Sequence, residues 1–152
     1  MPAYLFDSSA IAKHYCAEIG TDQVDAILSE AGNLCLISRL TVVELHSVFA
    51  TKVRRQEIAE ADFTLLRKRF LADGKQRVFR VAAMTAAVCS EAVQLLRTHA
   101  LGESLRTLDA LQLAVALELK QRGRLDHFVT ADKSLASVAT KAGIAVMNPE
   151  AS

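Results

Sequence analysis

The chain has 152 residues, of which 51% are hydrophobic and 23% charged, and its formal net charge is +1. This length and balance are typical of one globular domain with its own core, and they exclude a disordered or fibrous chain. No apolar run is long enough to cross a bilayer, and no basic segment precedes an apolar one at the start, so we expect neither a membrane partner nor a signal peptide.

The first half of the chain predicts two short strands and four helices. Apolar runs read as the strands, and the Asp7-Ser8-Ser9 sequence that follows the first run can cap a helix. In chain order the expected elements are a strand over Ala3–Phe6, a helix from about Ala10, a helix over Thr21–Ala31, a strand over Leu34–Ile37, and helices over Val42–Arg55 and Ala59–Ala72.

The second half continues the alternation of strands and helices. The expected elements are a strand over Val78–Val81, helices over Thr85–Thr98 and Leu108–Arg122, a strand over Phe128–Thr130, a helix over Lys133–Ala142 and a strand over Ile144–Met147. Short apolar strands that alternate with helices predict an α/β fold, here one domain over residues 1–150 with a mostly parallel sheet covered on both faces. Such folds bind ligands outside the carboxyl ends of the strands.

Four carboxylates are placed at this edge of the predicted sheet. Asp7 directly follows the first strand, and Asp132 follows the strand Phe128–Thr130 after one residue. Glu44 lies one turn into the helix after the second strand, and Asp109 lies in the first turn of the most apolar helix. The four acids are far apart in sequence, yet the expected topology brings them toward the same edge.

Each acid also has a structural interpretation. Asp7 and Asp132 can cap helices, Asp109 can favour the positive end of its helix dipole, and Glu44 can lie at the boundary of a buried face. The four together are harder to explain without a cation, because clustered carboxylates repel one another and raise their pKa values. Mg²⁺ and Mn²⁺ prefer oxygen ligands, and such a site suits metal-assisted attack of water on a phosphodiester.

Other chemistries have less support in the sequence. It contains no GxxxxGK[ST] loop, no GxGxxG and no GxSxG, and no His is placed to activate Ser8 or Ser9. A phosphoaspartyl enzyme acting through Asp7 stays open. Three cysteines, Cys16, Cys35 and Cys89, form no CxxC pair, and we interpret them as small buried thiols in a reducing, cytoplasmic compartment.

The segments around the four acids resemble a known family. In sequence order they match PIN-domain proteins, specifically the VapC-type toxins of bacterial toxin–antitoxin pairs, and the similarity spans nearly the whole chain. Where the family often has His, this chain has Gln112, which is not one of the family's acids. The matching segments are Leu5–Ala10 (LFDSSA), Ser38–Glu44 (SRLTVVE), Leu105–Ala114 (LRTLDALQLA) and Phe128–Asp132 (FVTAD).

The resemblance implies a fold, an activity and partners. The fold would be a PIN-like α/β/α sandwich, and the activity that of an endoribonuclease using Mg²⁺ or Mn²⁺, with RNA as substrate. Expected partners are a small VapB-like antitoxin that blocks the site and a second copy of the chain in a homodimer. The implied metal-binding acids are Asp7 and Asp109 as principal ligands, with Glu44 and Asp132 acting directly or through water, and the hydroxyls expected beside them are Ser8 and Thr130.

Two other functions remain open at this stage. A PIN-type nuclease with a housekeeping role in RNA processing would have the same residues as a toxin, and only a neighbouring antitoxin gene would separate the two. A catalytically silent module that binds RNA or protein would be marked by loss of an acid, whereas all four acids are present.

The middle of the chain is basic. The stretch from Lys52 to Arg80 contains nine basic and four acidic residues, so the remainder of the chain carries a net −4. Such asymmetry can attract a polyanion, but the solvated outer faces of two helices are sufficient to explain it, and the patch alone does not support nucleic-acid binding. Arg39, Arg106 and Lys133 flank the acids and are candidate phosphate contacts, again with plain surface charge as the alternative.

Overall fold

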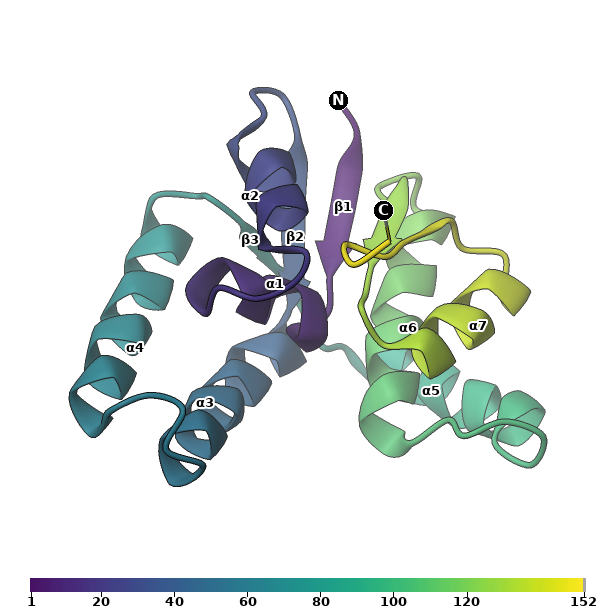
Figure 1. The fold of residues 1–152 in the computed structure, drawn as a ribbon. Coiled ribbons are helices and arrows are strands. Elements are labelled where there is room, and N and C mark those ends of the chain that lie inside the picture. The colour runs from purple at the N-terminus through teal and green to yellow at the C-terminus, as the bar shows by residue number, and fades with distance from the viewer. Residues whose placement is uncertain (152) are drawn as a thin grey trace.

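The computed structural model describes residues 1–151, and five parallel strands form its central sheet in the order β3-β2-β1-β4-β5. β1 lies in the middle, between β2 and β4, so the residues after these three strands meet at one edge (Figure 1). The strands are β1 (Ala3–Phe6), β2 (Leu34–Ser38), β3 (Arg80–Ala82), β4 (His127–Val129) and β5 (Val146–Met147).

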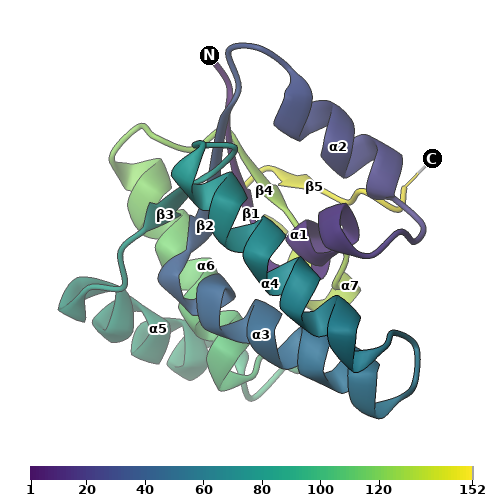
Figure 2. The same ribbon diagram turned by 90° about the vertical axis from the view of Figure 1, so that its left-hand side faces the viewer.

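Helices cover both faces of this sheet. In Figure 1, α1 to α4 lie on one side of β1 and α5 to α7 on the other, and Figure 2 shows α3 and α4 side by side across the first of these faces. The helices are α1 (Ser8–Tyr15), α2 (Thr21–Ser29), α3 (Arg39–Arg54), α4 (Glu60–Lys75), α5 (Ala86–His99), α6 (Thr107–Gln121) and α7 (Lys133–Lys141).

The core divides into two clusters because successive strand residues point to opposite faces of the sheet. Leu5 and its register neighbour Phe128 pack with residues of α5, α6 and α7. The next pair along the strands, Phe6 and Val129, packs with residues of α1, α2, α3 and α4. Phe6 and Phe128 are fully buried, so truncating either to Ala would cost about 3–5 kcal/mol. The two core clusters pack against both faces of β1 and β4, and so they position the residues that follow these strands.

The predicted α/β/α sandwich is confirmed, and the sheet is parallel throughout rather than mostly parallel. α3 begins at Arg39 instead of Val42, because the Ser38 hydroxyl accepts a hydrogen bond from Thr41 N (3.1 Å) and caps the helix directly after β2. β3 begins two residues later than predicted, because Val78 N still donates to a carbonyl of α4.

The interpretation of the cysteines as buried thiols is only partly correct. Cys35 is buried and Cys16 is half-buried, whereas Cys89 is exposed on α5. Among residues 1–151, none of the helices combines the length and apolar character that crossing a bilayer requires.

Candidate active site

The structure places the candidate side chains near the carboxyl ends of three adjacent strands. Asp7 follows β1 and caps α1, and Asp132 follows β4 and caps α7. Glu44 lies on α3, which starts immediately after β2, and Asp109 lies in the first turn of α6. Both capping roles are therefore confirmed, and the cap of α7 uses only Oδ1 of Asp132.

Asp7 is a buried carboxylate held by hydrogen bonds on both oxygens. Its Oδ1 accepts from Ser9 Oγ (2.7 Å) and from Ala10 N (2.9 Å), and its Oδ2 accepts from Thr130 Oγ1 (2.6 Å). The side chain is almost inaccessible, since Asp7 is only 4% exposed. Its rotamer is thus fixed by groups from two separate segments of the chain.

Thr130 and Ser9 join the end of β4 to the start of α1. The hydroxyl of Thr130 donates to Asp7 and accepts from Asp132 N (3.1 Å). The hydroxyl of Ser9 likewise donates to Asp7 and accepts from Ala131 N (3.0 Å). Thr130 lies beside the acids as the sequence indicates, whereas the role of Ser9 was not predicted.

Glu44 is oriented by two donors from different elements. Its Oε1 accepts from Ser8 Oγ (2.9 Å) on α1 and from Gln112 Nε2 (2.9 Å) on α6. The Ser8 hydroxyl therefore donates to Glu44 rather than to Asp7, its neighbour in sequence. Gln112 is buried and also contacts Ser38 and Thr41, so it links α6 to the start of α3.

Asp109 closes the first turn of α6. Its Oδ2 accepts from Arg106 N (3.3 Å) and lies 3.8 Å from Arg106 Nε. The Arg106 side chain is 86% exposed, so this ion pair is weak and leaves Asp109 Oδ1 available. Arg39 and Lys133 are exposed as well, in keeping with either a phosphate contact or plain surface charge.

Burial and mutual repulsion disfavour ionisation of these aspartates. Desolvation, opposed by the hydrogen bonds from Thr130, Ser9 and Ala10 and assisted by the charge of Asp132, raises the pKa of Asp7 to about 6. Burial and the Asp132 charge also raise the pKa of Asp109, against the Arg106 contacts that lower it. The negative charge of Asp132 thus acts on both other aspartates, and we refer to these three residues as the aspartate cluster.

The donor chemistry of this cluster fits a hard divalent cation. Carboxylate oxygens are the ligands that Mg²⁺ and Mn²⁺ prefer, and Mg²⁺ is typically held by one or two carboxylates while it keeps several waters. Within residues 1–151, no three or more His, Cys, Asp or Glu side chains are arranged so that together they could hold a metal ion. An ion at this site would therefore be held by one or two of the carboxylates and would complete its coordination with water.

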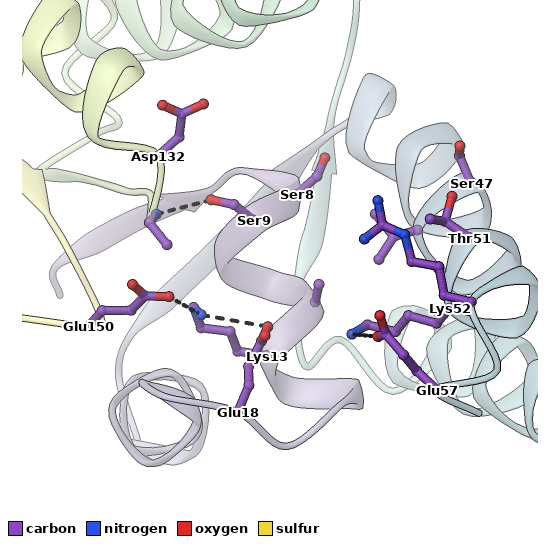
Figure 3. Close-up of a pocket in the computed structure, with 14 residues that line it drawn as sticks. Ser8, Ser9, Lys13, Glu18, Ser47, Thr51, Lys52, Glu57, Asp132 and Glu150 are labelled. Carbon is purple, nitrogen blue, oxygen red and sulfur yellow. Dashed lines mark hydrogen bonds and ion pairs between the residues drawn. The ribbon is translucent and has the colours of Figure 1, made fainter.

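A pocket of about 630 Å³ opens beside these acids. Figure 3 shows Ser8, Ser9 and Asp132 at one end of the pocket, and Ser47 and Thr51 of α3 across from α1. The candidate site is thus continuous with a cavity in the roughly 300–1,000 Å³ range of ligand pockets.

A model of the PIN domain matches residues 4–141. The chain belongs to the PIN-domain family. This agrees with the resemblance found in the sequence, and the four segments that carried the resemblance lie at the candidate site. A search of the curated proteins gave no significant match.

Solved structures share this PIN fold along nearly the entire chain. FitAcB from Neisseria gonorrhoeae is 22% identical with a TM-score of 0.67, over 96% of this chain and 97% of that one. VapC20 from Mycobacterium tuberculosis, described as a sarcin–ricin loop cleaving toxin, is 17% identical with a TM-score of 0.64, over 88% and 93%. VapBC-1 from nontypeable Haemophilus influenzae is 14% identical with a TM-score of 0.64, over 98% and 99%. At these identities the likeness concerns the fold alone.

Proposed function

We propose that this PIN-domain protein is a divalent-metal-dependent endoribonuclease and the toxin of a VapBC-type toxin–antitoxin pair. The observation that carries the proposal is the placement of Asp7 and Asp132 at adjacent strand ends, joined through the Thr130 hydroxyl, with Asp109 close enough for the charge of Asp132 to raise its pKa. A protein that retains such a cluster loses stability unless a cation relieves the repulsion. Membership of the PIN family, whose members are generally nucleases, supports hydrolysis of phosphodiester bonds as the use of that cation.

We propose that the acids bind the ion and that neighbouring polar side chains orient the acids. Asp7 and Asp109 would be the principal ligands of the ion, and Glu44 and Asp132 would act directly or through water. A divalent ion bound there supplies positive charge that favours attack of water on a phosphodiester. Thr130 and Ser9 fix the rotamer of Asp7, and Ser8 and Gln112 fix that of Glu44.

RNA is the proposed substrate. The resemblance to VapC toxins implies it. VapC20, which has the same fold, is a toxin that cleaves the sarcin–ricin loop, an RNA target. The exposed cations near the acids, Arg39, Arg106 and Lys133, are suited to phosphate contacts.

The proposed partners are a small VapB-like antitoxin and a second copy of the chain, in the cytoplasm. Structures of the same fold include a toxin–antitoxin complex from Klebsiella pneumoniae. The site itself offers a physical basis for inhibition: carboxylates that bind a cation also accept a cationic side chain, so a partner's Arg or Lys can replace the ion. A PIN nuclease of RNA processing would lack an adjacent antitoxin gene.

The direct test is digestion of mixed cellular RNA by the purified protein, with Mg²⁺ and with EDTA, followed by sequencing of the cut ends. We expect discrete cleavage sites in Mg²⁺ and intact RNA in EDTA. Cleavage that persists in EDTA would contradict the metal requirement, and intact RNA with Mg²⁺ and Mn²⁺ would contradict the nuclease.

A further inference from the structure

The pocket beside the acids has one wall built by α3 and its C-terminal end. At its acidic end the pocket is lined by Ser8, Ser9 and Asp132, which belong to the candidate active site or border it. At its far end it is lined by side chains that no step of the proposed function uses. These are Ser47, Thr51, Lys52 and Arg55.

The α3 wall forms a straight polar stripe that starts at the acids. Glu44, Ser47, Thr51 and Arg55 are spaced by three or four residues, so they lie on one face of the helix and at its end. From Glu44 to Arg55 the stripe extends about 16 Å, at about 1.5 Å per helical residue. Nucleotides in a stacked strand are about 3.4 Å apart along the axis, so this length spans several of them.

Two of the three cations that line the pocket are already neutralised. The buried Lys13 Nζ lies 2.6 Å from a Glu150 oxygen and 3.5 Å from a Glu18 oxygen. Lys52 Nζ lies 3.2 Å from Glu57 (Figure 3).

The third cation is Arg55, which is exposed at the C-terminal end of α3. In the described part of the chain, its guanidinium takes part in no hydrogen bond or ion pair. An incoming phosphate can therefore bind Arg55 without first displacing a carboxylate. The neighbouring Arg54 is also exposed, but it does not line this pocket, and it donates to Thr51 Oγ1 (3.1 Å).

We infer that this pocket holds the RNA strand on one side of the scissile phosphate, with Arg55 binding a backbone phosphate several nucleotides from the acids. The hydroxyls of Ser47 and Thr51 face the intervening stretch, where hydroxyl groups suit phosphate oxygens and 2′-hydroxyls. Arg55 is thus a positioning residue that selects single-stranded RNA extending beyond the cut. The inference rests on the proposed function and adds the path of the substrate to it.

The test compares Arg55→Ala with the matched control Arg54→Ala, both in an Asp7→Asn background that keeps the RNA intact. Binding of a short fluorescent single-stranded RNA is measured by anisotropy over a range of salt concentrations. We expect Arg55→Ala to weaken binding about fivefold, the size expected for one exposed charged contact. The slope of log affinity against log salt should fall by about 0.7, as for one lost phosphate contact in a single strand.

Arg54→Ala should leave both quantities unchanged, and Arg55→Lys should restore most of the affinity because it keeps the charge. If the RNA is shortened on the side of the cut that reaches Arg55, proteins with Arg55 and with Arg55→Ala should bind it with the same affinity. If it is shortened on the other side, the difference in affinity should remain.

Identical effects of the two alanine variants would overturn the inference. If the otherwise unmodified protein still cuts RNA in Mg²⁺, the proposed nuclease stands and only the substrate path is wrong. A protein that neither binds nor cuts RNA would overturn the proposed function together with this inference.

Discussion

Gln112 Nε2 donates a hydrogen bond to Glu44 Oε1 at 2.9 Å, so a buried amide on α6 sets the orientation of a candidate catalytic acid on α3. The same nitrogen donates to Thr41 Oγ1 (2.7 Å), and Gln112 Oε1 accepts from Ser38 Oγ (2.9 Å). Gln112 thereby satisfies two buried hydroxyls and one carboxylate at once. An amide provides a donor and an acceptor without a charge, which suits a position next to an acid.

We predict that Gln112→Leu destabilises the protein by about 1–3 kcal/mol, because the buried hydroxyls of Ser38 and Thr41 each lose the hydrogen bond to Gln112. Nuclease activity should fall as well, since Glu44 keeps only the Ser8 contact. Urea unfolding and RNA cleavage rates measure the two effects. The control is Gln121→Leu, an exposed position on the same helix, which should change neither. Wild-type stability in Gln112→Leu would show that the network is dispensable.

Asp7→Asn should abolish cleavage while the fold is kept. Asn has nearly the same shape, and its amide can still accept from Ala10 N and contact Thr130, but it lacks the charge that a divalent cation needs. We expect a loss of at least about a hundredfold in rate, as befits several kcal/mol of transition-state stabilisation. Asp22→Asn, at an exposed acid on α2, is the matched control and should retain full activity. An active Asp7→Asn variant would exclude Asp7 as a ligand.

The same substitution has a pH-dependent effect on stability in the absence of divalent ions. Below pH 3.8 Asp7 is protonated in the folded and unfolded states, so its burial has little cost. As pH rises toward 6, the unfolded state ionises first, and stability falls. Above pH 6 the loss is complete, at up to about 3 kcal/mol for a shift of about two pKa units.

Asp7→Asn removes this loss of stability. Its free energy of unfolding, relative to that of the wild type, should therefore increase from pH 4 to 6 and then level off. Urea unfolding in EDTA across this range measures the difference, and added Mg²⁺ should stabilise only the wild type near neutral pH. A difference that stays constant with pH would contradict the raised pKa.

The sequence predicted the frame of the site better than its details. Apolar runs and capping residues sufficed to place Asp7 and Asp132 at adjacent strand ends, because parallel strands share one carboxyl edge. The contacts of Ser9 and Gln112 were missed, because they depend on packing between α1, α3 and α6 rather than on any local pattern. Two signals pointed to Gln112: it is a polar residue within the otherwise apolar face of α6, and it occupies a position where PIN-domain proteins often have His.

Replacing Arg67 and Lys68 of α4 by Glu should weaken RNA binding and flatten its salt dependence, if the basic middle of the chain contacts phosphates. Both side chains are exposed. Arg69, their neighbour, is left unchanged because its guanidinium lies 5.3 Å from the centre of the Tyr15 ring and within 3.3 Å of His14. A control reversal of Arg97, on α5 across the sheet, should have little effect. Unchanged binding would identify the α4 charges as a solvated helix face.

Thr130→Val should shift the acid limb of the activity profile to higher pH. The hydroxyl of Thr130 donates to Asp7 Oδ2 at 2.6 Å and stabilises the ionised carboxylate, so it partly offsets the burial of Asp7, whose pKa is about 6 with this hydrogen bond in place. Without that donor the pKa of Asp7 rises further, and a higher pH is needed before Asp7 can bind a cation. kcat/KM for RNA cleavage, measured across pH 5 to 8 at fixed Mg²⁺, follows the shift.

Two further variants separate this effect from general damage. Thr130→Ser keeps the hydroxyl and should restore the wild-type profile, whereas a purely steric role for Thr130 would leave Ser and Val equally impaired. Thr140→Val, at an exposed threonine of α7 whose hydroxyl donates to Ala136 O (2.9 Å), should leave the limb in place. An acid limb that does not move in Thr130→Val would mean that the protonation of Asp7 does not govern the activity.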